Sequence, residues 1–237
     1  MSARRLLVVI DGPAGAGKST VARALAARLG GTYLDTGAMY RALTLRALRL
    51  GVDLEDPAAL ERVAREARLE LVPGPGGLSV RLDGEDVSRE IRTLEVTRNI
   101  RWLAEHAGAR AVLVALQRRF AAAASGPVVA EGRDLASVVF PDAEVKVYLD
   151  ASPAERARRR AAELGPGSPP VEQLQREIEE RDRRDATRAV APLRRVPEAV
   201  YLDSSHLDAE EVLARLVALA GVERGAPDPG GGSHLRL

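Results

Sequence analysis

The sequence of 237 residues contains no cysteine, few aromatic residues and only two lysines among its thirty-five basic residues. Without cysteine the chain can form no disulfide, no iron–sulfur cluster and no thiolate zinc site. Its three histidines, His106, His206 and His234, lack the spacing of metal ligands, so we expect no histidine metal site. The composition therefore excludes a disulfide framework and argues against a transition-metal centre.

Charge, aromatic content and hydropathy argue against two further classes of partner. The net charge is only +1 and aromatic residues make up 3% of the chain, which disfavours a nucleic-acid-binding surface. No apolar run approaches the roughly 20 residues that a membrane-spanning helix needs. The run Leu6–Ile10 stops at Asp11 and is typical of a buried strand, not of a signal peptide. We expect a cytoplasmic protein that binds neither membrane nor nucleic acid.

Short apolar runs alternate with amphipathic helical patterns along most of the chain. The alternation predicts an α/β fold, a five-stranded parallel sheet flanked by helices. Ser152 and Glu155 have the spacing of a capping box at the start of one helix. The expected strands are 6–10, 33–34, 128–130, 145–149 and 199–203, and the expected helices are 18–29, 38–50, 57–68, 93–105, 108–124, one from 153, 171–188 and 208–220.

Two stretches depart from this alternation. Residues 69–90 alternate polar and apolar side chains around a Gly- and Pro-rich turn, which predicts a small antiparallel β insert. The tail, residues 223–237, is rich in Gly and Pro, and we expect it to be disordered.

A phosphate-binding loop follows the first strand. The segment 12–19 matches G-x-x-x-x-G-K-[ST], a pattern whose glycines let backbone N–H groups converge on phosphate oxygens. Lys18 would reach the outer phosphates, and the Ser19 hydroxyl would ligate Mg²⁺. The alternative is a chance glycine-rich turn, and Lys146 is interpreted as structural. The predicted ATP-binding loop comprises Gly12, Pro13, Ala14, Gly15, Ala16, Gly17, Lys18, Ser19 and Thr20.

The rest of the chain narrows the class of phosphate-binding protein. A GTPase needs an Asn-Lys-x-Asp motif, but Ile100 follows Asn99, which is the single Asn. No strand ends in the Asp-Glu pair of motor-type ATPases. Arginines at the ends of core elements instead suit a kinase that neutralises two phosphate-bearing substrates.

In the predicted helix 171–188, residues spaced three and four apart lie on one face. This face is apolar in the first half of the helix and charged in the second half. This pattern predicts that its second half points into a cleft, where Arg can bind phosphate and Asp can accept from sugar hydroxyls. The alternative is a solvated helix end with salt bridges. The residues of this face are Val171, Leu174, Ile178, Arg181, Asp185 and Arg188.

Four blocks in this order resemble the bacterial cytidylate (CMP) kinase family: 10–20, 34–41, 131–134 with 138–143, and 181–192. The resemblance covers about residues 6–220. It implies a P-loop fold, transfer of the γ-phosphoryl group of ATP to CMP and dCMP, a requirement for Mg²⁺, and a monomer. It also implies a core of 1–35, 126–155 and 186–222, a monophosphate-binding domain of 36–125 that carries the insert, and a lid of 156–185.

The resemblance also implies site residues. Thr36, Arg41, Arg133 and Arg188 would hold the acceptor phosphate, and the catalytic set would be Lys18, Arg41, Arg133 and Arg188. The sugar would contact Asp185 and Arg181, and the base would contact Arg110 and Asp134. Alternatives are a helix N-cap for Thr36, a surface position for Arg41 and a solvated helix face for Arg110. Arg156, Arg159 and Arg160 would close over ATP, unless they belong only to an exposed arginine-rich helix.

Base recognition follows from chemistry and contains one departure from the family. A carboxylate at Asp134 accepts from the exocyclic amino group of cytosine but repels the carbonyl of uracil. An unpaired buried acceptor costs roughly 1–3 kcal/mol, which predicts about one to two decades of preference for CMP over UMP. Arg101 stands where the family has a small hydroxyl residue near the base, so it is included as a CMP-contacting candidate that alters the pocket.

Three other functions remain open from the sequence. One is a different small-molecule kinase, acting on UMP, dTMP or a shikimate-type substrate. Another is a regulatory module that binds a nucleotide without phosphoryl transfer. The third is nucleic-acid binding, which would require salt-dependent retention on DNA to be supported.

Overall fold

The computed structural model describes residues 6–74 and 77–221 and contains a five-stranded sheet in the order β2-β6-β1-β7-β8. Every neighbouring pair in this sheet is parallel, which confirms the predicted architecture. The predicted tail, 223–237, lies outside the described residues. The strands of this sheet are β1 (Leu7–Asp11), β2 (Thr32–Asp35), β6 (Val128–Gly132), β7 (Val145–Asp150) and β8 (Val200–Asp203).

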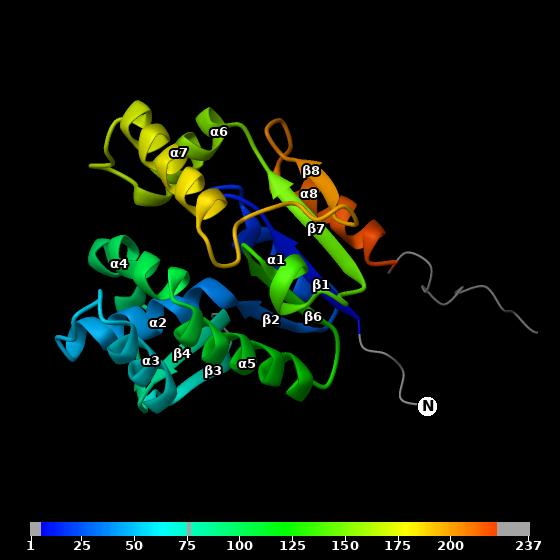
Figure 1. The fold of residues 1–237 in the computed structure, drawn as a ribbon. Coiled ribbons are helices and arrows are strands. Elements are labelled where there is room, and N and C mark those ends of the chain that lie inside the picture. Colours follow the sequence, from blue (N-terminus) through cyan, green and yellow to red (C-terminus); the bar gives the residue numbers. More distant parts are fainter. Residues whose placement is uncertain (1–5, 75–76, 222–237) are drawn as a thin grey trace, which may run out of the picture.

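Helices cover both faces of the sheet (Figure 1). Along β1, Val8 and Ile10 pack into a cluster with α1 (Lys18–Arg28) and α8 (Ala209–Leu219). Val9 points the other way, into a cluster that includes α2, α3 and α5. This alternation is the reason why a continuous apolar run is required: both faces of the strand are buried. The three helices of the second face are α2 (Thr36–Arg49), α3 (Pro57–Glu66) and α5 (Ala107–Ala123).

The β insert is a separate three-stranded antiparallel sheet, as predicted. Its strands are β3 (Leu69–Gly74), β4 (Gly77–Leu82) and β5 (Glu85–Asp86). Val80, Leu82 and Ile91 from this region pack against α2 and α4 (Leu94–Glu105) in their own cluster. The insert therefore extends the α2–α5 side of the molecule and adds no strand to the main sheet.

A hairpin of α6 (Pro153–Leu164) and α7 (Val171–Thr187) forms the third part of the fold. Ala157, Leu174 and Ile178 make a small core between these two helices. Figure 1 shows the hairpin beyond the carboxyl ends of the strands, with α2–α5 on the opposite side of the same edge. Among the residues that the structure describes, no helix is long and apolar enough to cross a membrane.

At two helix starts, the alternative considered for Thr36 and the capping box predicted at Ser152 are wrong. The N-cap of α2 is Asp35, whose carboxylate accepts from the backbone N–H of Ala38 at 2.8 Å, so Thr36 does not cap the helix. At α6, Ser152 accepts from Glu155 N at 3.3 Å, but the reciprocal bond of a capping box is replaced by a bond from Ser152 N to Ser205 Oγ. The Glu155 side chain pairs with arginines of its own helix instead.

Candidate active site

The phosphate loop connects the end of β1 to the start of α1 and requires two of its glycines for different reasons. A Cβ on Gly12 would lie 1.9 Å from the carbonyl oxygen of Leu149, so β7 leaves no room for a side chain there. Gly17 is the N-cap of α1 and has φ of 88°, a left-handed conformation that glycine adopts without strain. The loop therefore places the amino end of α1 at the carboxyl edge of the sheet, where anions bind.

Lys18 is buried in this loop, and its Nζ donates to the carbonyl oxygen of Pro13 at 2.6 Å. Burial, and to a smaller extent the charge of Arg133, lower the pKa of Lys18 to about 7, while Glu131 and Asp11 act in the opposite direction. A lysine in this environment gains most from an anionic ligand, because the ligand restores the interactions that its charged form lost with water.

Asp11 joins the phosphate loop to the segment after β6. Its buried carboxylate accepts from the backbone N–H groups of Leu135 at 3.0 Å and Ala136 at 2.8 Å. Burial raises the pKa of Asp11 to about 6, against the effect of these two hydrogen bonds. The sequence analysis missed this residue. Its position in the sequence could have marked it as a site residue, since Asp11 ends a strand at the edge where α/β proteins bind ligands.

The three arginines predicted to hold the acceptor phosphate each have an acidic partner. Arg41 pairs with Asp35 at 3.0 Å, and this Asp lies at the carboxyl end of β2. Arg133 pairs with Asp185 of α7 at 3.2 Å. The side chain of Arg41 is only 19% exposed, so a surface position for this arginine is wrong. Asp35 is the second residue that the sequence analysis missed.

Thr36 contacts the same region from the first turn of α2. Its hydroxyl donates to the carbonyl oxygen of Glu131 at 2.6 Å, which joins the start of α2 to the end of β6. The Glu131 carboxylate accepts from the Tyr33 hydroxyl at 2.8 Å, and burial and this bond raise the pKa of Tyr33. The ends of β2 and β6 are thus held together directly under the predicted phosphate contacts.

A buried carboxylate lies between two arginines at the predicted base site. Asp134 forms a close ion pair with Arg110, and Arg188 lies 3.4 Å from its other oxygen. Arg110 is 3% exposed, so the solvated helix face considered for it is wrong. Its guanidinium also lies 5.6 Å from the centre of the Tyr40 ring, and burial raises the pKa of Tyr40 to about 12.

The charged residues at the end of α7 that were predicted to share one face are Arg181, Asp185 and Arg188. Arg181 is held where burial and the charge of Arg133 lower its pKa to about 10. Asp185 forms an ion pair with Arg133, and Arg188 forms one with Asp134. This face therefore contacts the segment after β6, here called the β6 loop, at two points. The helix ends at Thr187, and Arg188 Nε donates to the carbonyl oxygen of Ala191 at 2.5 Å. The alternative of a solvated, salt-bridged helix end is therefore wrong for these three residues.

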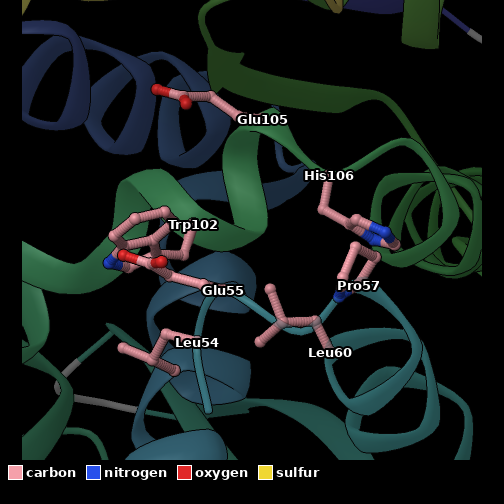
Figure 2. A pocket seen from close by; sticks show the side chains of 7 residues that line it. All are labelled: Leu54, Glu55, Pro57, Leu60, Trp102, Glu105 and His106. Carbon is pink, nitrogen blue, oxygen red and sulfur yellow. The ribbon is translucent and has the colours of Figure 1, made fainter.

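Arg101 is not brought to this cluster in the described part of the chain. It is exposed, and its guanidinium stacks on the ring of Trp102, 4.5 Å from the ring centre. Trp102 lines a small cavity of about 150 Å³ on the α3–α4 side (Figure 2), and no residue of the phosphate loop lines it. The other residues that line it are Leu54, Glu55, Pro57, Leu60, Glu105 and His106. None of the predicted site residues belongs to this cavity.

The three predicted lid arginines differ in their environments. Arg156 is buried and donates to Ala151 O at 2.9 Å and to Ala14 O at 3.0 Å. Arg159 donates to Ala16 O at 3.3 Å and to Ser204 O at 2.7 Å. Arg160 is paired with Glu163 on the exposed side of α6. Two of the three therefore contact the phosphate loop itself.

A larger cavity of about 390 Å³ adjoins the loop on the α8 side. It combines loop backbone, apolar side chains and a few polar groups, a lining typical of a small-molecule site. The sequence analysis did not single out its far wall, the segment 204–209. Its residues are Ala16, Gly17, Thr20, Val21, Leu149, Glu155, Arg159, Ser204, Leu207, Asp208, Ala209 and Val212.

A parallel sheet with a phosphate loop after its central strand, together with this buried lysine, defines a P-loop nucleotide-binding protein. The arginines predicted to hold the acceptor phosphate, Arg41, Arg133 and Arg188, are each paired with a carboxylate. The chain belongs to the cytidylate kinase family, whose model matches residues 8–221.

Two curated relatives are similar to this chain over most of its length. A cytidylate kinase of Solibacter usitatus is 52% identical over 88% of this chain and 89% of that protein. A bifunctional pantoate ligase/cytidylate kinase of Prochlorococcus marinus is 49% identical over 94% of this chain, which spans only 45% of that longer relative. Among solved structures, TT1252 from Thermus thermophilus covers 94% of this chain and 100% of its own, with 21% identity and a TM-score of 0.49.

Proposed function

We propose that the protein is a nucleoside monophosphate kinase of the cytoplasm that transfers the γ-phosphoryl group of ATP to CMP, and also to dCMP. The bond between the γ-phosphorus and the β–γ bridging oxygen breaks, and a bond from this phosphorus to an oxygen of the acceptor phosphate forms. The products are ADP and CDP, or dCDP. The observation that carries the proposal is the buried Arg110–Asp134–Arg188 cluster, placed one loop away from a phosphate-binding lysine.

The donor side follows from the loop and the cavity beside it. Loop N–H groups and the amino end of α1 would hold the ATP phosphates, and Lys18 would exchange its bond with Pro13 O for a phosphate oxygen. The 390 Å³ cavity on the α8 side offers the space for the adenosine part of ATP. Arg159 and Arg160 are assigned to the outer phosphates when the lid region, 156–185, closes.

The residues present fit a magnesium ion that arrives with the nucleotide. Within the described residues, no group of three or more His, Cys, Asp or Glu side chains could hold a metal ion without help. The Ser19 hydroxyl is exposed at the start of α1, and a single protein oxygen together with phosphates and water is a usual Mg²⁺ environment. When bound, the ion neutralises charge on the transferred phosphoryl group.

The acceptor side is assigned to the domain 36–125 and to α7. Thr36, Arg41, Arg133 and Arg188 would hold the phosphate of CMP, since three cations and a hydroxyl suit a dianion. Asp185 and Arg181 lie on the face of α7 that reaches the β6 loop, where they would contact the ribose. The acceptor is already an anion at neutral pH, so these residues need only position it and compensate its charge.

Asp134 would read the base. Its carboxylate is buried and held by Arg110, so it presents an acceptor to the amino group of cytosine and would repel the carbonyl of uracil. In the present structure Arg101 lies on Trp102, not at this cluster, which supports a pocket that retains the preference for cytosine. We propose that the protein acts as a monomer, as its resemblance to the family implies.

A substrate panel tests the proposal. The rate of ADP release with ATP and Mg²⁺ is measured against CMP, dCMP, UMP, AMP, GMP and dTMP. We expect fast turnover of CMP and dCMP and at least about tenfold slower turnover of UMP, the lower end of the estimate from an unpaired buried acceptor. Equal rates on CMP and UMP would contradict the role of Asp134. ATP binding without turnover of any acceptor would instead favour a regulatory module.

A further inference from the structure

The peptide group of Ala14, inside the phosphate loop, is held at both ends by the α6–α7 hairpin. Its N–H donates to Asp182 Oδ1 of α7 at 3.2 Å, and its carbonyl oxygen accepts from Arg156 Nη1 of α6 at 3.0 Å. The two side chains also pair with each other through Arg156 Nη1 and Asp182 Oδ2. The three groups form a closed set of contacts between two helices and one loop peptide.

The environment of this set suits a structural clamp better than a ligand contact. The Arg156 side chain is 6% exposed and that of Asp182 is 19% exposed. Arg156 Nε is also engaged, by the carbonyl oxygen of Ala151 at 2.9 Å. A guanidinium has five N–H groups, and three of these therefore point to protein oxygens and away from a phosphate.

The backbone of α6 also packs closely on the phosphate loop. A Cβ on Gly15 would lie 3.1 Å from both the Cβ and the carbonyl oxygen of Arg156. An added methyl group would therefore require the loop or the helix to move by a few tenths of an ångström. A change in the position of Asp182 or Arg156 is expected to move the loop peptide with it.

On α7, Asp182 lies next to residues that are assigned to the acceptor. Its neighbour Arg181 and, one turn further, Asp185 belong to the face assigned to the acceptor, and Asp185 pairs with Arg133 at 3.2 Å. The same turn of helix therefore touches the donor loop on one side and the acceptor residues on the other. A shift of about 1 Å between reacting groups can cost about 10²-fold in rate.

We infer that Asp182, with Arg156 as its partner, is a positioning residue that sets the phosphate loop in register with the acceptor residues of α7. This inference rests on the proposed function, and it assigns Arg156 a role behind the loop in place of a direct contact with ATP. Asp182 accepts from a loop N–H and is not among the residues assigned to either substrate. Its removal would leave the acceptor site intact and disturb the donor site.

Variants of Asp182 test the inference by steady-state kinetics with ATP and CMP varied separately. Asp182→Ala removes both contacts, and we expect kcat/KM for ATP to fall about 10–100-fold, the effect of losing a charged hydrogen bond, with KM for CMP within about twofold. Asp182→Asn keeps an oxygen for the N–H of Ala14 and should restore a large part of this loss. Glu180→Gln removes a carboxylate from an exposed position on the same helix and serves as the matched control.

The outcomes separate this inference from the proposed function. If the unmodified protein does not phosphorylate CMP, the proposed function fails, whatever the variants do. If it does, and Asp182→Ala keeps the ATP parameters of the unmodified protein, the positioning role is wrong. Equal losses for ATP and CMP together with a lowered melting temperature would also contradict it, since they show general damage to α7. If Asp182→Ala does not fold, the Asn variant and Arg156→Lys decide by the same split between ATP and CMP.

Discussion

At the scale of single residues, Lys18 is the buried cation of the phosphate loop. It is buried, bonded to the loop carbonyl of Pro13, and has its pKa lowered to about 7. We expect Lys18→Ala to lower turnover by roughly two orders of magnitude or more, as for other preorganised charge contacts, without loss of the fold. The measurement is the ADP-release rate together with a thermal melt. Lys146→Ala, at the only other lysine, is the control, and equal effects of both changes would remove Lys18 from the site.

The lowered pKa of Lys18 also predicts a proton coupled to nucleotide binding. At pH 8 a lysine with a pKa of about 7 is mostly neutral in the free protein, whereas bound phosphates favour its charged form. ATP binding is therefore expected to take up close to one proton at pH 8 and little at pH 6. Calorimetry in buffers of different ionisation enthalpy measures this uptake. In Lys18→Met the uptake should vanish, and an unchanged value there would place the titration elsewhere.

Base recognition at Asp134 is testable by substrate preference. Asp134→Asn puts an amide in place of the carboxylate that Arg110 and Arg188 hold, so it can no longer present two acceptor oxygens. We expect kcat/KM for CMP to fall more than that for UMP, which reduces the ratio of the two by about tenfold or more. Specificity constants for both nucleotides give the answer. Equal losses on both would show that Asp134 acts only on the structure of the pocket.

At the scale of elements, the contact between the phosphate loop and β7 depends on Gly12. Because its Cβ would lie 1.9 Å from Leu149 O, Gly12→Ala must displace either the loop or the strand. Gly30→Ala is the matched control, since Gly30 also has positive φ but has nothing within 4 Å of an added Cβ. We expect the control to cost about 1–2 kcal/mol from backbone strain alone, and Gly12→Ala to cost more. Urea unfolding measures both, and equal losses would contradict the close packing described here.

Most strands and helices could be predicted from the sequence, because short apolar runs indicate buried strands and apolar residues at helical spacing indicate helices. The carboxyl edge of the sheet as the place of the site could also be predicted. The five strands and the β insert follow from patterns of burial that leave a direct imprint on residue order. Helix ends were harder because a cap depends on neighbours that are distant in the sequence. Ser152 illustrates this, since its N–H bonds to Ser205 from another loop and not to Glu155. The helix expected to reach residue 68 ends at Glu66, because strand β3 begins at Leu69 and pairs with Leu82.

The site could be predicted where one motif carries both chemistry and position. On the predicted face of α7, Asp185 pairs with Arg133 and Arg188 pairs with Asp134. The roles of these residues and of Lys18 in substrate binding stay predictions. Partners that only the folded chain brings close were missed. Asp35 and Asp182 are examples, because their roles lie in contacts to Arg41 and to the Ala14 peptide, which no spacing in the sequence reveals.

At the scale of the whole molecule, Asp11 links stability to pH. Burial raises its pKa from 3.8 to about 6, so the folded protein holds this proton more tightly than the unfolded chain. Its protonation therefore favours folding, and this contribution is present below about pH 4 and lost as the pH rises through about 6. We expect the unfolding free energy of the protein, minus that of Asp11→Asn, to fall by on the order of 2–3 kcal/mol between pH 4 and pH 7. Denaturant unfolding across this range checks the slope, and a flat difference would contradict the raised pKa.

The ion pairs around the site have a consequence for affinity. Arg41, Arg133 and Arg188 each already have a carboxylate partner, from Asp35, Asp185 and Asp134. A phosphate that enters this site must compete for guanidinium groups that are satisfied beforehand, so binding is a change of partners and not a simple gain of contacts. Part of the intrinsic attraction is spent on separating each pair, which moderates the affinity for a highly charged ligand. When a product leaves, the arginines regain their former partners, and the departure of the anion is correspondingly easier.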